Sequence, residues 1–253
     1  AAYHWKEGNP QYHSVDSLPG QISITDQHGQ EVPLTRHEVS TAIKVVGVVQ
    51  SLDGSMDGQL NELFERATEM GLRIRESNIT RQTAWIGILS LIWPSLRYCL
   101  PVTVFTQQEG RRALTQLYKY LLPKLGVPRT LPLVYRYAPR GLQGLGLPDP
   151  YVEQGIEHIK RLIFHGESGT TTGILFRQSI EQLQLEAGTS CAIFDASIED
   201  YGPLTTYCWV KSVWAFTQQH GIVLRNDLMR GPQPARENDK FLMEVLVQDK
   251  VFR

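Results

Sequence analysis

Residues 80–93, with the sequence TRQTAWIGILSLIW, decide the class of fold. Apolar side chains recur there three and four positions apart, the spacing of one helical face: Trp85, Ile88, Leu89, Ile92 and Trp93. Thr80 stands before the run and is a suitable N-cap, because its hydroxyl can accept a backbone N–H of the first turn. Pro94 follows and is expected to bend or stop the helix.

Helical periodicity continues on both sides of this stretch. An amphipathic helix is expected around residues 60–71, ending at Gly71, and another begins after Thr106. Further helical patterns occupy residues 151–164, 172–185, 204–219 and 239–247. Between them, residues 123–150 are rich in glycine and proline and contain a short strand-like run at residues 133–137.

The first fifty residues have the pattern of short strands instead. Residues 22–25 and 32–35 flank His28-Gly29, which predicts a hairpin. Residues 44–49 form a β-branched run of strand length. The sequence therefore predicts a mainly α protein, α+β overall. A strand-containing region at residues 1–54 precedes a helical domain at residues 55–253 with a Gly/Pro-rich basic stretch near 123–150.

Composition is that of an ordinary globular chain. Hydrophobic residues make up 42% and charged residues 20%, which is too apolar for a disordered chain, and the net charge is −1. Cys99, Cys191 and Cys208 are odd in number and widely spaced, which favours free thiols in a reducing, intracellular compartment, cytoplasmic or nuclear. No apolar stretch reaches the ~20 residues of a membrane span, so no membrane partner is expected. Because the chain begins at Ala1 without methionine, we expect a fragment of a longer protein.

Positive and negative side chains are segregated along the chain. Residues 110–148, here called the basic segment, contain no Asp or Glu, whereas residues 149–200, the acidic segment, are dominated by them. The candidate nucleic-acid contacts are the seven cations Arg111, Arg112, Lys119, Lys124, Arg129, Arg136 and Arg140. They are interleaved with Tyr118, Tyr120, Tyr135 and Tyr137, and such a surface suits a phosphate backbone. The alternative is that the basic and acidic segments pair with each other in the folded domain.

Other patterns give little support to a catalytic or metal site. The glycines of residues 141–148 lack the GxGxxG spacing and are interpreted as a turn that packs closely. The seven histidines lack metal-ligand spacing and are interpreted as surface or locally bonded residues. Residues 195–200 are interpreted as a turn and helix cap rather than a magnesium site. The tryptophans of the helical patterns are expected in the core. No catalytic residue and no metal ligand is predicted, and a stand-alone enzyme is the least favoured class.

Several long stretches of sequence in the middle of the chain resemble the region downstream of the palm in non-LTR retrotransposon reverse transcriptases, of the type found in algae and other protists. The resemblance is carried by residues 80–85 (TRQTAW), 92–101 (IWPSLRYCLP), 121–126 (LLPKLG) and 135–148 (YRYAPRGLQGLGLP), and continues in residues 153–159 and 173–181. It covers residues 40–190 and, more loosely, the remainder.

The resemblance implies the end of the palm, the thumb and the region downstream of it. Residues 45–48 would be the strand that closes the palm, and the later helices would hold the primer–template duplex. The family's catalytic aspartates lie in a Tyr-x-Asp-Asp turn, and this sequence has no Asp-Asp pair. Magnesium and polymerase activity would therefore belong to the missing upstream part, and no cofactor and no activity are expected in this chain. Implied partners are an RNA–DNA or DNA duplex and the upstream palm and fingers. The alternative is a structural or protein-interaction helical module without nucleic-acid binding, including one from a degenerate element.

Overall fold

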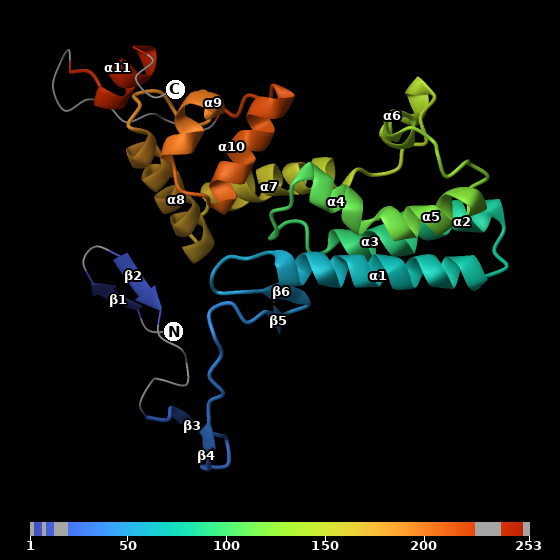
Figure 1. Ribbon diagram of the computed structural model, residues 1–253, viewed down its shortest axis with the longest axis horizontal. Helices are drawn as coiled ribbons and strands as arrows, with labels where there is room; N and C mark the ends of the chain where they lie inside the picture. The colour runs from blue at the N-terminus through green and yellow to red at the C-terminus, as the bar shows by residue number, and fades with distance from the viewer. Residues whose placement is uncertain (1–2, 7–8, 13–19, 226–238, 250–253) are drawn as a thin grey trace. The chain divides into compact units, whose positions relative to one another are not determined.

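A computed structural model describes residues 3–6, 9–12, 20–225 and 239–249 of the 253-residue chain (Figure 1). The chain divides into two compact units, Ala1–Glu62 and Leu63–Arg253. The described strands lie in the first unit as small two-stranded sheets, and helices make up the second. The predicted mainly α fold with a small β region is thereby confirmed. The domain boundary expected after residue 54 stays a prediction.

The described strands of the first unit form antiparallel hairpins. β1 (Tyr3–Lys6) pairs with β2 (Asn9–Tyr12), β3 (Ser23–Thr25) with β4 (Glu31–Pro33), and β5 (Ile43–Val45) with β6 (Val48–Gln50). The hairpin predicted around His28-Gly29 is the β3–β4 pair. The carboxylate of Asp26 closes its turn by accepting the backbone N–H of His28 at 2.8 Å and of Gln30 at 2.9 Å.

The single strand predicted for residues 44–49 is wrong, because the chain reverses in the middle of it. Val46 and Gly47 have φ angles of 49° and 85°, and β5 and β6 pair across this two-residue turn. Glycine reaches such angles without steric cost, so one glycine converts a long β-branched run into a hairpin. The backbone N–H of Val49 then donates to the Gln59 side chain at 2.6 Å.

Helix α1 (Asp57–Glu76) runs past Gly71, so the end predicted at that glycine is wrong. A β-carbon at Gly71 would lie 3.0 Å from the carbonyl oxygen of Gln116 and 3.2 Å from the Cα of Leu117. The glycine therefore serves the close contact between α1 and α5 (Thr115–Lys124) rather than the termination of a helix.

The central apolar stretch is one helical run with a change of register. α2 (Arg81–Gly87) leads into a π-helical turn, η2 (Ile88–Ile92), and then α3 (Trp93–Arg97). Thr80 caps it as predicted, accepting the Thr83 N–H at 3.2 Å. The N–H of Trp93 bonds the carbonyl of Ile88, five residues back. The bend expected at Pro94 takes this form, since proline supplies no N–H to the ladder and a wider turn precedes it.

α4 (Gln107–Ala113) begins with the cap predicted at Thr106. The Thr106 hydroxyl accepts the N–H of Glu109 at 3.2 Å, and the Glu109 carboxylate accepts the N–H of Thr106 at 2.8 Å. α4 and α5 are joined at Leu114, whose backbone stays in the helical region (φ −92°, ψ 0°).

The strand-like run at residues 133–137 is one helical turn, α6 (Leu133–Tyr137), so the strand interpretation is wrong. A helical turn brings Leu133 and Tyr137 to the same side, whereas a strand would also have placed Tyr135 there. The following 3-10 turn, η3 (Arg140–Leu142), ends at Gln143 with φ 63°. A β-carbon at Gly144 would lie 2.0 Å from the Ala138 carbonyl oxygen, which supports the packing interpretation of the glycines in residues 141–148.

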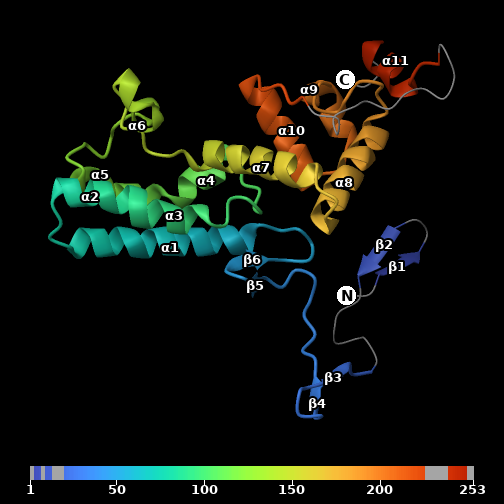
Figure 2. The same cartoon turned by 180° about the vertical axis from the view of Figure 1, so that it is seen from behind.

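The remaining helices follow α6 along the chain of the second unit, and several of them lie side by side (Figure 2). They are α7 (Pro150–Gly166), α8 (Thr171–Ala187), α9 (Ile198–Tyr201), η4 (Gly202–Leu204), α10 (Trp209–His220) and α11 (Leu242–Gln248). Trp214 is fully buried among apolar side chains of α7, α8 and α10, and its indole N–H donates to the Ala196 carbonyl at 2.9 Å. Of the other tryptophans expected in the core, Trp93 is buried, while Trp85 and Trp209 are half-buried.

Candidate nucleic-acid interface

Arg112 and Lys119 lie on one exposed face of α4 and α5. The pattern of burial places them there: Arg112, Thr115 and Lys119 are exposed, while the intervening Leu114 and Leu117 are buried. The two cations are seven positions apart in the sequence, and the junction of α4 and α5 at Leu114 lies between them. Within the described part of the chain, neither side chain has an ion-pair partner, although the Lys119 ammonium lies 5.5 Å from the Tyr120 ring centroid.

Arg129 and Arg140 are also exposed but lie in different surroundings. Arg129 stands in the turn after α5 and makes no hydrogen bond or ion pair with any described residue. The guanidinium of Arg140 lies over the Trp85 ring at 4.9 Å from its centroid, and its Nε donates to the Leu145 carbonyl at 3.4 Å. A stacked arginine keeps its charge, so Arg140 still adds positive potential.

Arg111 is committed to an ion pair inside the domain. Its Nη2 lies 2.8 Å and its Nε 3.3 Å from Oδ2 of Asp149, a side chain that is only 7% exposed. The guanidinium also lies 5.6 Å from the Tyr137 ring centroid. Asp149 is at the same time the N-cap of α7, accepting the Tyr151 N–H at 3.0 Å. Arg111 therefore fixes α4 to the start of α7 and is poorly placed to release its partner for a phosphate.

Lys124 and Arg136 are likewise used inside the fold. The Lys124 ammonium donates to the Ser77 carbonyl at 2.6 Å. The Arg136 guanidinium lies 5.0 Å from the Tyr118 ring centroid, and its Nη2 donates to the Leu131 carbonyl at 3.4 Å. Its buried Nε has no hydrogen-bond partner among the described residues. Of the seven candidate cations, Arg112, Lys119, Arg129 and Arg140 thus face solvent, while Arg111, Lys124 and Arg136 are half-buried.

The tyrosines of the basic segment divide in the same way. Tyr118 is buried, its hydroxyl donates to the Pro148 carbonyl at 3.3 Å, and its ring meets the Tyr137 ring edge-on at 6.3 Å. Burial, reinforced by Tyr137, raises the pKa of Tyr118 well above its ordinary value, so its hydroxyl stays protonated. Tyr135 is 55% exposed on α6 and is the tyrosine of this group most open to a base or sugar.

The basic and acidic segments meet at the pair between Arg111 and Asp149. Other acidic side chains are bonded elsewhere: Glu157 to Lys160 of its own helix at 2.9 Å, and Glu186 to the backbone N–H of Thr206 at 2.6 Å. Pairing between the basic and acidic segments, the alternative to phosphate binding, therefore occurs at one end of the basic segment. Arg112, Lys119 and Arg129 take no part in it.

A groove of about 800 Å³ lies beside this pair, between the α2–α3 run, α6 and the start of α7. Its wall includes Leu89, Leu133 and Val134, which are 44%, 41% and 76% exposed. Arg97 and Glu153, 3.7 Å apart, lie along its polar side.

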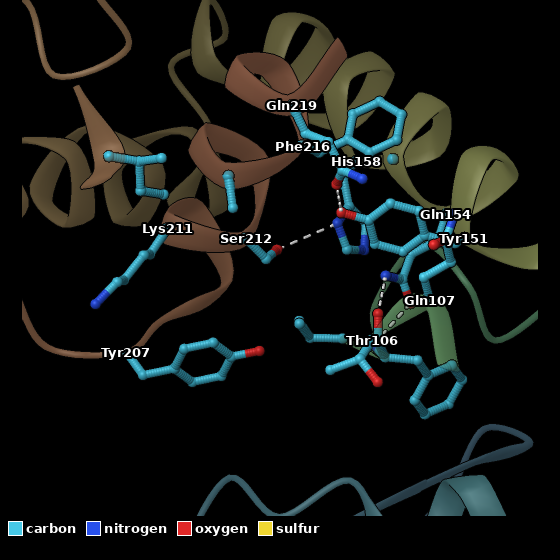
Figure 3. A pocket seen from close by; sticks show the side chains of 15 residues that line it. Thr106, Gln107, Tyr151, Gln154, His158, Tyr207, Lys211, Ser212, Phe216 and Gln219 are labelled. Carbon is cyan, nitrogen blue, oxygen red and sulfur yellow. Dashed lines mark hydrogen bonds between the residues drawn. The ribbon is translucent and has the colours of Figure 1, made fainter. Parts of the chain in front are cut away.

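A second concavity, of about 330 Å³, lies between α4, α7 and α10 (Figure 3). Gln154 and His158, four residues apart on α7, hold the segment between α3 and α4 beneath it. The Gln154 amide exchanges hydrogen bonds with both backbone groups of Phe105 at 2.9 and 3.0 Å. His158 Nε2 lies 2.8 Å from the Thr103 carbonyl and 3.0 Å from the Leu100 carbonyl. Sequence reasoning interpreted His158 only as surface or locally bonded. The available signal was that both polar residues interrupt the apolar face of a helix.

Burial lowers the pKa of His158 to about 4, against the opposing effect of the two carbonyls. The ring is therefore neutral near pH 7. A neutral ring can donate from Nε2 to the two carbonyls that face it. The neighbouring Ser212 hydroxyl donates to the Trp209 carbonyl at 2.6 Å.

The part of the chain that the structure describes holds no group of three or more His, Cys, Asp or Glu side chains able to bind a metal ion. Among its helices, none is both long and apolar enough to cross a membrane. Comparison with known proteins found no matching family, no matching curated protein and no matching solved structure.

Proposed function

We propose that this chain is a non-catalytic, thumb-like part of a retroelement reverse transcriptase that holds a primer–template duplex by its phosphates. The sequence stretches at residues 80–85, 92–101, 121–126 and 135–148 suggest the family. The observation that carries the binding proposal is the exposed pair Arg112 and Lys119 on one face of α4 and α5, with Arg129 beyond them.

Three physical features support backbone contact rather than recognition of sequence. The exposed cations have no ion pair to break among the described residues, so binding a phosphate costs them little. Arg112 and Lys119 are fixed on packed helices, since Leu114, Leu117 and Leu121 of the same helices are buried. Lysine and arginine contacts to phosphates orient a protein on a duplex but carry no base information. Arg140 lies over the Trp85 ring and adds positive potential without being counted as a phosphate contact, whereas Arg111, Lys124 and Arg136 are assigned to holding the segment together.

The catalytic carboxylates and magnesium of such an enzyme would lie in the upstream part of the parent protein. The chain would then work with that palm and fingers region, and by itself it would extend no primer.

The proposal is tested with fluorescence anisotropy of a labelled RNA–DNA hybrid titrated with the chain. The variant Arg112→Gln/Lys119→Gln should bind about 10-fold more weakly, since two exposed contacts contribute about 0.7 kcal/mol each. The control Lys160→Gln/Arg161→Gln removes the same charge from exposed positions on α7, outside the basic segment. Equal losses in both variants would contradict a specific surface on α4 and α5 and leave only a general effect of net charge.

A second candidate function is a protein-interaction module, and the apolar groove beside α6 favours it. Exposed apolar side chains that line a concave surface are common at protein–protein contacts. In this case the mass in solution should rise with protein concentration or on addition of the upstream region. Leu89→Ser/Val134→Ser should abolish that rise, and the hybrid should not bind at low salt.

A further inference from the structure

The concavity between α4, α7 and α10 has the dimensions and the mixed lining of a small-molecule site. Its volume of about 330 Å³ falls within the range usual for such sites. All of its lining residues belong to the second unit. It is separate from the exposed cations, and none of the seven candidate phosphate contacts lines it.

The floor of this pocket carries a buried hydrogen-bond acceptor. His158 is 1% exposed, and its Nε2 faces the carbonyl oxygens of Thr103 and Leu100 at 2.8 and 3.0 Å. Two carbonyls can only accept, so Nε2 must carry the ring proton. Nδ1 of the neutral ring is then an acceptor.

No strong donor serves that acceptor among the described residues. The Ser212 hydroxyl oxygen lies 3.4 Å from His158 Nδ1 but only 2.6 Å from the Trp209 carbonyl oxygen. A hydroxyl has one hydrogen, and the shorter contact is the one it makes. Nδ1 of His158 and the oxygen lone pairs of Ser212 are therefore two neighbouring acceptors at the pocket (Figure 3).

Aromatic rings form the walls around these acceptors. Tyr151 and Phe216 meet edge-on, with ring centroids 5.5 Å apart, and the Tyr151 hydroxyl donates to the Gln219 side chain at 2.7 Å. Tyr207, 66% exposed, stands at the opposite rim and turns its hydroxyl toward the middle of the pocket (Figure 3). Flat aromatic walls with acceptors at the base favour a planar ring that carries an N–H donor.

We infer that this pocket binds a planar nitrogen heterocycle of the nucleobase class, with an N–H of the ligand donating to His158 Nδ1 and Ser212 Oγ, and the ligand ring packed against Tyr207 and Phe216. The ligand could be a free heterocycle or a base extruded from a single strand, and the chemistry is the same. This inference does not depend on phosphate binding by Arg112 and Lys119.

The test uses the whole chain and isothermal titration calorimetry with two matched purines. 9-Methyladenine has its only N–H donors on the exocyclic nitrogen, whereas 6-dimethylamino-9-methylpurine has the same ring system and no donor. The first should bind and the second should bind at least about tenfold more weakly, because the buried acceptors would be left unpaired. Equal binding of both, or no binding of 9-methyladenine at ~10 mM, would overturn the inference.

Two variants locate the site. Ala215→Phe places a large ring in the pocket, and Tyr207→Ala removes the exposed wall without disturbing the core. Both should weaken 9-methyladenine binding at least about tenfold, while the control Phe164→Ala, which removes an aromatic ring that is 73% exposed on α7 and does not line the pocket, should not. If both pocket variants bind like the control, the assignment is wrong. Circular dichroism checks that Ala215→Phe folds. If that variant does not fold, binding of 9-methyladenine to Tyr207→Ala alone tests the location of the site.

A short single-stranded oligodeoxyadenylate separates the two sources. Binding that Ala215→Phe abolishes indicates a base presented by a strand. Binding of 9-methyladenine alone indicates a free heterocycle. Either result supports the pocket, and neither depends on Arg112→Gln/Lys119→Gln, so the two proposals succeed or fail separately.

Discussion

Changing Arg111 to glutamine should destabilise the second unit, because it removes the cation that faces a buried carboxylate. Asp149 is 7% exposed and receives two N–H groups of Arg111, at 2.8 and 3.3 Å. Breaking a fully buried ion pair from one side costs about 3–5 kcal/mol. The loss should be smaller here, because the site is partly open to water: the Arg111 side chain is 30% exposed. Asp149 also keeps its hydrogen bond from the Tyr151 N–H, which continues to stabilise its charge. We expect a loss of about 1–3 kcal/mol in the free energy of unfolding.

The measurement is urea unfolding followed by circular dichroism, arranged as a double-mutant cycle. Asp149→Asn keeps the capping ability of the side chain and removes its charge. Arg111→Gln/Asp149→Asn should therefore be more stable than the sum of the single losses predicts, with a coupling of about 1–2 kcal/mol. Arg112→Gln is the matched control, since it removes the same charge from an exposed neighbour and should change stability by less than about 0.5 kcal/mol. Equal effects of Arg111→Gln and Arg112→Gln would refute the role of the pair.

Two further predictions concern α7. Gly155→Ala should lower the free energy of unfolding by about 1–3 kcal/mol, because the added β-carbon would lie 2.3 Å from the Phe216 ring. The control is Gly87→Ala, at a helical position with open space around it, which should be neutral or stabilising by up to about 1 kcal/mol in the same urea unfolding assay. The pKa of His158 is about 4 in the folded chain, against its ordinary value of 6.5. Between pH 6.5 and pH 4 this ring is therefore protonated in the unfolded chain and neutral in the folded chain, which favours unfolding. The free energy of unfolding should be highest above pH 6.5 and should fall by about 3 kcal/mol as the pH drops to 4. Unfolding curves between about pH 4 and 7 test this. The same pH dependence in His158→Gln would contradict the assignment to that ring.

Local signals in the sequence predicted most of the long helices and two of their caps. Thr80 and Thr106 cap helices as expected, because a threonine before an amphipathic run satisfies free N–H groups without help from distant residues. Gly47 and Gly71 were harder to interpret. One reverses the chain within a β-branched run and the other lies inside α1 against α5, and the difference depends on what packs beside each glycine.

The candidate interface could be predicted only as a set of residues. Alternation of cations and tyrosines suggested a surface, yet Arg136 lies over Tyr118 and Arg111 over Tyr137, so part of that alternation is internal packing. Helical spacing alone would have separated Arg112 and Lys119 from Arg111, since the first two follow the exposed face and Arg111 lies toward α7.

The pocket could not be predicted, because its parts come together only in the folded chain. His158 lies on α7, whereas Ser212 lies on α10 and Tyr207 just before it, and the three residues match no catalytic or binding motif. The polar pair Gln154 and His158 on the apolar face of α7 was the one local sign that a buried hydrogen-bond network lies there.

The salt dependence of duplex binding tests the central claim most directly. Each phosphate contact contributes a slope of about −0.9 to a plot of log K against log salt, so Arg112, Lys119 and Arg129 together predict about −2.7. Affinity for a DNA duplex should then fall about 40-fold between 50 and 200 mM salt, and Arg112→Gln/Lys119→Gln should reduce the slope to about −0.9. The Lys160→Gln/Arg161→Gln control should keep the steep slope. A slope that is the same in the wild-type chain and in Arg112→Gln/Lys119→Gln, or no binding at 50 mM salt, would contradict the claim that α4 and α5 hold a duplex by its phosphates.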